Sequence, residues 1–155
     1  MEELSIDCIR LGEWVRSHDE IEVTAEDIID FAQAFDPQPW HLSSTMAQNT
    51  PFGSLAASGW HTAALTMRLI VGMGLTGLIG KKTTLNWPTP TRPGDRLHVN
   101  LKVIDIRDSQ TKPNLQVITI EYLTLNQTNE VRQETHATVL KVKQGDDDLI
   151  GSSLV

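Results

Sequence analysis

The feature that most constrains the fold is an apolar helix in the middle of the chain. Residues 60–71 have helical composition and no charged side chain except Arg68. The apolar residues fall on nearly every side of that helix: Ala63, Ala64, Leu65, Met67, Leu69, Ile70 and Val71. Such a helix is typical of a protein interior and not of a surface. We therefore expect the rest of the chain to wrap around it.

The second half of the chain supplies strands for that wrapping. Residues 97–103 alternate apolar and polar side chains, as a strand with one buried face does. Residues 115–125 and 131–142 are rich in β-branched residues and flank a polar turn, which predicts a hairpin. A further strand is expected near residues 82–86. Helices followed by antiparallel strands predict an α+β fold, with a curved antiparallel β-sheet wrapped around a long central α-helix.

A first helix is predicted at residues 25–35, before the central one. Thr24 is a candidate N-cap, because its hydroxyl can accept a hydrogen bond from the first turn. Pro37 and Pro39 prevent the helix from continuing, since each lacks an N–H and disfavours helical geometry in the residue before it. We therefore expect residues 36–41 to form a stiff loop.

Composition excludes several classes of protein. The chain has 155 residues, the size of one domain, and its net charge of −7 makes it a poor nucleic-acid binder. Cys8 is the single cysteine, so no intrachain disulfide or cysteine-based zinc site is possible. No segment resembles an export signal or a membrane span. We expect one domain at residues 1–143, an acidic flexible tail at 144–155, a cytoplasmic location, and neither metal nor membrane contact.

Asp36 and His41 are the strongest candidates for chemistry. They place a carboxylate and an imidazole five positions apart on a segment stiffened by two prolines, and fixed geometry is what acid–base catalysis needs. Taken singly, each residue is more often structural. Their joint spacing with Pro39, followed by glycines before the apolar helix, favours a functional pair.

Three motifs together carry a resemblance to a known family. Residues 36–41 match the pattern Asp-x-Asn-Pro-x-His, with Gln38 at the Asn position. Residues 51–59 contain Pro-Phe-Gly and Ala-Ser-Gly before the central helix, and residues 90–95 read Pro-Thr-Arg-Pro-Gly-Asp. These motifs resemble those of MaoC-like (R)-specific enoyl-CoA hydratases and 3-hydroxyacyl dehydratases, and the similarity extends over residues 21–142. The resemblance implies a hot-dog fold.

The resemblance also implies a reaction and a catalytic set. Asp36 and His41 would hold a water molecule and move protons as water adds to, or leaves from, the double bond of an enoyl thioester. The backbone N–H of Gly59 would stabilise the thioester oxygen. Unpaired N–H groups at a helix N-terminus favour such an oxyanion on physical grounds as well. Coenzyme A or an acyl carrier protein would enter only as part of the substrate, and no cofactor is expected.

Five further residues near the motifs are candidates for substrate binding: Gln38, Trp40, Gly53, Ser58 and His61. His61 has two equal interpretations, because a histidine in a first helical turn can reach a pocket or simply pack. Trp40 is more typical of a core than of an acyl tunnel.

Two other functions remain open beside the hydratase or dehydratase. One is a hot-dog thioesterase, which is disfavoured because residues 60–71 contain no Asp or Glu. The other is a non-catalytic protein that binds acyl thioesters. In each case we expect a homodimer, or an oligomer of dimers, because a single curved sheet leaves an edge strand unpaired.

Overall fold

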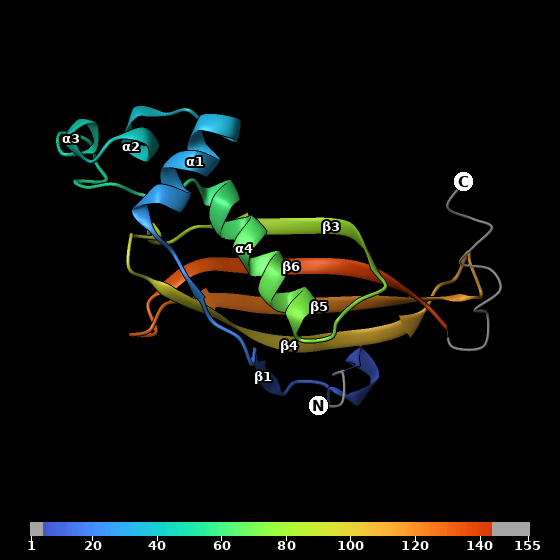
Figure 1. The fold of residues 1–155 in the computed structure, drawn as a ribbon. Helices are drawn as coiled ribbons and strands as arrows, with labels where there is room; N and C mark the ends of the chain where they lie inside the picture. The colour runs from blue at the N-terminus through green and yellow to red at the C-terminus, as the bar shows by residue number, and fades with distance from the viewer. Residues whose placement is uncertain (1–4, 144–155) are drawn as a thin grey trace.

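The computed structural model describes residues 5–143, so the tail expected at 144–155 lies outside the described residues. The strands form one antiparallel sheet in the order β1-β4-β5-β6-β3, with β2 paired to β4 (Figure 1). The strands are β1 (Trp14–Arg16), β2 (Ile21–Glu22), β3 (Leu78–Asn86), β4 (Arg96–Asp108), β5 (Leu115–Leu125) and β6 (Val131–Val142). The helices are η1 (Ile6–Cys8), α1 (Ala25–Phe35), α2 (Pro39–Leu42), α3 (Ser44–Ala47) and α4 (Gly59–Gly72).

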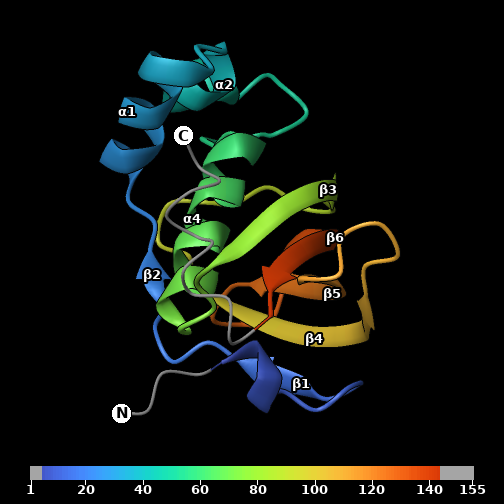
Figure 2. The ribbon, with the colours of Figure 1, turned by 90° about the vertical axis from the view of Figure 1, so that its right-hand side faces the viewer.

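The predicted arrangement of sheet and central helix is confirmed. The sheet curves along one side of α4, as Figure 2 shows. The core between them is apolar and includes Ile28 of α1, Leu69 of α4, Leu97 and Leu101 of β4, and Ile118 of β5. The hairpin of β5 and β6 has the predicted bounds, and its turn is closed by the Asn129 N–H, which donates to the Asn126 carbonyl.

The prediction that α4 is enclosed on all sides was wrong for the single chain. Trp60 is 60% exposed, Met67 52% and Val71 47%, and they lie on one face of the helix. The sheet is a single layer and can cover only the opposite face. Counting apolar residues therefore identified the central helix correctly but overestimated how much of it this chain buries.

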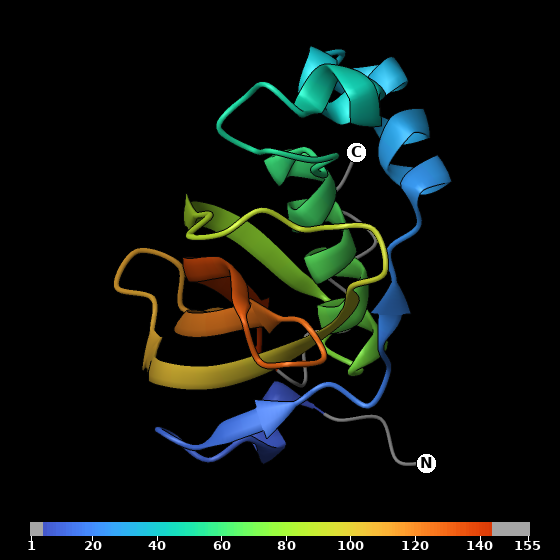
Figure 3. The same ribbon diagram turned by 90° about the vertical axis from the view of Figure 1, so that its left-hand side faces the viewer.

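The segment 36–41 is only partly a loop, which corrects a second prediction. Helix α1 ends at Phe35 as expected, but α2 begins at Pro39 and contains His41. Proline is well accommodated at the first position of a helix, because its missing N–H has no partner there and its φ is already helical. Figure 3 shows α1, α2 and α3 gathered over the end of α4 where that helix begins.

A buried ion pair fixes the turn that leads into β4. Asp95 accepts hydrogen bonds from the Arg132 Nε at 2.9 Å and the Arg132 Nη2 at 3.2 Å. It also accepts from the Arg92 backbone N–H and the Asn126 side-chain amide. Breaking such a pair leaves an uncompensated buried charge, which typically costs about 3–5 kcal/mol. The pair therefore holds the turn at residues 92–95 against β6.

Candidate active site

The loop and α2 bring Asp36 and His41 together. The Asp36 Oδ2 lies 3.4 Å from the His41 Nε2. The other ring nitrogen, Nδ1, lies 2.6 Å from the backbone carbonyl of Ala56. Because a carbonyl can only accept, Nδ1 must carry the hydrogen and donate it. In the neutral ring, Nε2 then has a free lone pair facing the carboxylate, so the two groups can accept hydrogen bonds from one water molecule.

The segment before α4 connects this pair to the far wall of the site. The Ala56 N–H donates to the Trp40 carbonyl, and the Ala57 N–H donates to the Thr91 carbonyl at 2.9 Å. Residues 56 and 57 thus lie between His41 on one side and Thr91 on the other. This explains how residues 50 positions apart in the sequence line the same space.

A pocket of about 270 Å³ opens beside His41. Two of the predicted catalytic residues, His41 and Gly59, line it, while Asp36 approaches it through its contact with His41. Its other lining residues are Phe52, Ala57, Thr62, Trp87, Thr89, Pro90, Thr91 and Arg132. A site that combines apolar walls with a few polar groups is typical of a small-molecule pocket.

Gly59 is the first residue of α4, and its backbone N–H has no hydrogen-bond partner among residues 5–143. The next N–H, that of Trp60, is already capped by the Ser58 hydroxyl at 3.2 Å. A Cβ built on Gly59 would lie 2.6 Å from the Trp87 ring, closer than real Cβ contacts allow. Glycine is therefore required here by a close approach of the indole, in addition to any role in binding substrate.

Comparison with known proteins establishes the family. The sequence pattern of the MaoC like domain matches residues 9–124. The chain belongs to this family. A solved MaoC-like dehydratase from Rhodospirillum rubrum is 45% identical, with a TM-score of 0.85 over 91% of this chain and 98% of that one. The (R)-hydratase PhaJ1 from Pseudomonas aeruginosa shares the hot-dog fold at 22% identity, with a TM-score of 0.67 over 88% and 84% of the two chains.

A curated relative carries a named activity. The 3-hydroxybutyryl-CoA dehydratase of Methylorubrum extorquens is 33% identical over 97 residues. That match spans 61% of this chain and 61% of the length of the relative. Membership of the MaoC-like family and these relatives support a hydratase or dehydratase function for the present protein.

The five residues predicted to bind substrate do not line the pocket of this MaoC-like domain. Gln38 and Gly53 are exposed, and Trp40 stacks on Phe52 at 5.8 Å. Ser58 is buried as the N-cap of α4, and His61 stacks on Phe31 of α1 at 4.6 Å. Their roles stay predictions, but through this pocket they can act only by supporting its walls. Sequence reasoning missed Thr62, Trp87, Thr89 and Arg132 as lining residues, because no local pattern distinguishes them. It also missed Thr91, which lies in the motif of residues 90–95, because that motif was used only to recognise the family.

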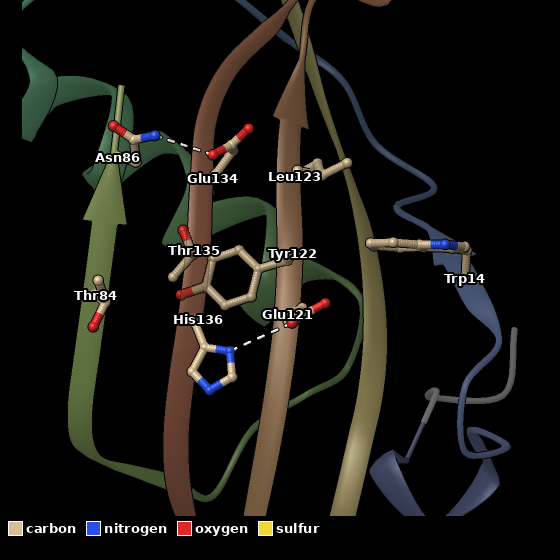
Figure 4. A pocket seen from close by; sticks show the side chains of 9 residues that line it. All are labelled: Trp14, Thr84, Asn86, Glu121, Tyr122, Leu123, Glu134, Thr135 and His136. Atoms are coloured by element: carbon tan, nitrogen blue, oxygen red, sulfur yellow. Dashed lines mark hydrogen bonds and ion pairs between the residues drawn. The ribbon is translucent and has the colours of Figure 1, made fainter. Parts of the chain in front are cut away.

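A second pocket, of about 320 Å³, lies over the sheet between β1 and β3 (Figure 4). Its charged side chains already have protein partners. Glu121 contacts His136 at 3.5 Å and Lys102 at 3.8 Å, and the Asn86 amide donates to Glu134 at 3.1 Å. None of the candidate catalytic residues lines it. We therefore place the candidate active site at the pocket beside His41.

Among residues 5–143, no three His, Cys, Asp or Glu side chains are grouped so that they could bind a metal ion. Within the same residues, no helix is long and apolar enough to cross a membrane.

His61 should make the stability of the domain depend on pH. Burial lowers its pKa below the usual 6.5, while Asp27 opposes this shift. Its Nδ1 is buried and has no hydrogen-bond partner among the described residues. Below pH 6.5 the unfolded chain therefore binds more protons at this position than the folded chain, so the free energy of unfolding falls as pH falls. His61→Phe keeps an aromatic ring against Phe31 and removes the titrating group.

We expect His61→Phe to flatten this decline, as measured by urea unfolding between pH 7.5 and 5.5. A variant at His98 is the appropriate comparison for His61→Phe. Burial lowers the pKa of His98 too, but this residue lies on β4, away from α1. An unchanged pH dependence in His61→Phe would mean that His61 contributes nothing to it.

Proposed function

We propose that this protein catalyses the reversible addition of water to the double bond of an enoyl thioester, giving a 3-hydroxyacyl thioester. The observation that carries the proposal is the contact of 3.4 Å between the Asp36 carboxylate and the His41 Nε2, in a member of the MaoC-like family. Both groups can accept a hydrogen bond, so one water molecule can donate to both. This orients a lone pair of the water oxygen toward the β carbon of the substrate.

In hydration, the water oxygen bonds to the β carbon as the double bond breaks. Asp36 and His41 together remove one proton from the water and deliver one to the α carbon, so that the atoms of one water molecule are added. The bond between His41 Nδ1 and the Ala56 carbonyl keeps the ring in the required orientation. Dehydration is the same path in reverse. The addition of water involves no net oxidation or reduction, so we keep the prediction that no cofactor takes part.

Negative charge passes to the thioester oxygen as the water adds. The Gly59 N–H, at the start of α4 and in the pocket of His41, is the proposed donor to that oxygen. The partial positive charge of the helix N-terminus acts in the same direction.

A relative with a named activity suggests the acyl group to test first. The activity named for the Methylorubrum extorquens relative concerns a four-carbon acyl group. We propose crotonyl-CoA as the first substrate to test, with carrier-protein thioesters as an alternative.

The test is an assay of crotonyl-CoA with the purified protein. A hydratase lowers the absorbance of the conjugated enoyl thioester without releasing thiol, and it restores that absorbance when given (R)-3-hydroxybutyryl-CoA. Release of free coenzyme A would instead indicate a thioesterase. Binding without turnover would indicate an acyl-binding protein, and either result would reject the proposal.

We also propose that two copies of the chain associate through the exposed face of α4. Trp60, Met67 and Val71 form an apolar stripe there, and Met67 and Val71 line a groove of about 330 Å³ with residues of the edge strand β3. An apolar stripe beside an unpaired strand edge is a typical site of association. A two-fold axis would place each stripe against its copy.

Met67→Asp should convert this dimer to monomers, because it puts a charge into the stripe. Light scattering at micromolar concentration measures the change. Met46→Asp is the matched control, since Met46 is 56% exposed on α3 and should leave the dimer intact. A monomeric unaltered protein would contradict the prediction.

A further inference from the structure

Two buried hydroxyls in the pocket leave one hydrogen without a partner. Thr62 of α4 and Thr91 are each 2% exposed, and their Oγ1 atoms lie 2.8 Å apart. Each hydroxyl has one hydrogen to donate. Their mutual bond uses one of the two, and neither oxygen bonds to any other group among residues 5–143. Leaving a buried donor unpaired typically costs about 1–3 kcal/mol. The spare hydrogen therefore indicates that a bound ligand accepts it.

The neighbouring pair of hydroxyls on the same helix is different. The Thr66 Oγ1 donates to the Thr62 carbonyl at 2.8 Å and lies 2.6 Å from the Thr124 Oγ1. Since Thr66 gives its hydrogen to the carbonyl, Thr124 donates to Thr66, and both hydrogens have acceptors. Thr66 also does not line the pocket. The unused donor is therefore specific to Thr62 and Thr91, the pair that does line it.

The position of this pair places it near Gly59. Thr62 lies three residues after Gly59, so both are on one face of α4, and helical side chains lean toward the N-terminus. Thr91 is tied to the same region by its carbonyl, which accepts from the Ala57 N–H. Together with His41, the pocket thus contains two donors that have no partner in the described part of the chain, the Gly59 N–H and one threonine hydroxyl.

We propose that the Thr62–Thr91 pair donates the second hydrogen bond to the thioester oxygen, beside the Gly59 N–H. The proposal rests on the hydration reaction proposed above. The pair transfers no atom; it stabilises the charge that develops on the oxygen as water adds to the β carbon. The mutual bond can run in either direction, so either hydroxyl can present the free hydrogen.

Because either hydroxyl can present the free hydrogen, we expect an unusual pattern of turnover among the threonine variants. Thr62→Val and Thr91→Val each leave one hydroxyl, whose hydrogen then becomes free, so each should cost less than about tenfold in kcat. The double variant has no donor and should lose about a hundredfold, as expected for an oxyanion contact. The double Thr→Ser variant should retain activity. Thr66→Val should lower the melting temperature but leave kcat near that of the unaltered protein.

A second measurement tests whether the threonine pair donates its hydrogen bond to the thioester oxygen. The carbonyl stretch of bound [1-¹³C]butyryl-CoA, which cannot be hydrated, should fall in frequency in the unaltered protein because donors polarise the bond. The shift should be smaller in the double Thr→Val variant and full in Thr66→Val. A double variant with unchanged turnover and an unchanged shift would overturn the proposal. So would lost turnover with a full shift, because the hydroxyls would then act elsewhere.

The two hypotheses fail in distinguishable ways. If the unaltered protein hydrates neither crotonyl-CoA nor a carrier-protein enoyl thioester, the proposed function is wrong, yet the butyryl-CoA shift still reports whether the pair contacts the carbonyl. If the protein hydrates crotonyl-CoA and the double variant behaves like Thr66→Val, only the role of the pair is wrong. The double Thr→Ser variant separates loss of the hydroxyls from loss of folding.

Discussion

Asp36→Asn and His41→Asn should each lower the turnover of crotonyl-CoA hydration by roughly two to four orders of magnitude, the range typical of acid–base catalysis. Asn at position 36 keeps the size of the side chain but cannot take a proton. Asn at position 41 retains a donor for the Ala56 carbonyl and removes the basic Nε2. Initial rates of enoyl absorbance loss measure the effect, and melting temperatures check that both variants fold.

Matched controls come from groups of the same chemistry outside the pocket. Asp30→Asn changes an exposed carboxylate on α1, the helix that ends just before Asp36. His136→Ala removes an exposed imidazole of β6 that contacts Glu121. Both should keep near-normal turnover. Normal activity in either variant of the catalytic pair would remove that residue from the mechanism.

The losses of turnover caused by Asp36→Asn and His41→Asn should also be far from additive. Asp36 and His41 act on the same water molecule, so once one of them is gone the other can contribute little. The variant with both changes should therefore resemble the more damaged single variant. A loss equal to the product of the two single losses would show that they act in separate steps.

The parts of the fold predicted correctly are those set by local signals. Thr24 caps α1 by accepting from the Asp27 N–H, and Pro37 follows the last residue of that helix by two positions, so both ends were readable. The β5–β6 hairpin has long β-branched strands around a polar turn. By contrast, β1 and β2 contain three and two residues, too few for an alternating pattern to be recognised.

The active site was predictable only where its residues are close in the sequence. Asp36 and His41 share one short motif, and the structure brings them into contact. The far wall of the pocket depends on tertiary contacts instead. Thr62 and Thr91 are 29 positions apart and meet only because β3 runs away from α4 and the following segment returns to its start. No periodicity or motif in the sequence predicts that Thr62 and Thr91 come into contact.

Gly59→Val should lower turnover by on the order of a hundred- to thousandfold, which is the usual loss when an oxyanion donor is disabled. Valine keeps the backbone N–H but obstructs the approach of the thioester oxygen to it. The side chain also meets a second obstacle, because its Cβ would lie 2.6 Å from the Trp87 ring. The indole cannot move freely, since its Nε1 donates to the buried Gln133 at 2.9 Å. Gly59→Val alone should therefore lower the melting temperature as well as turnover.

Trp87→Ala separates these two effects, because it removes the ring that the new side chain would strike. In the Trp87→Ala background, Gly59→Val should have little further effect on the melting temperature and should still lower turnover by about a hundredfold, since the obstruction of the oxyanion contact remains. The comparison is made between Trp87→Ala and the variant with both changes, using turnover and thermal melting. If adding Gly59→Val to Trp87→Ala leaves turnover unchanged, glycine is needed at position 59 only to accommodate the indole, and the thioester oxygen binds elsewhere.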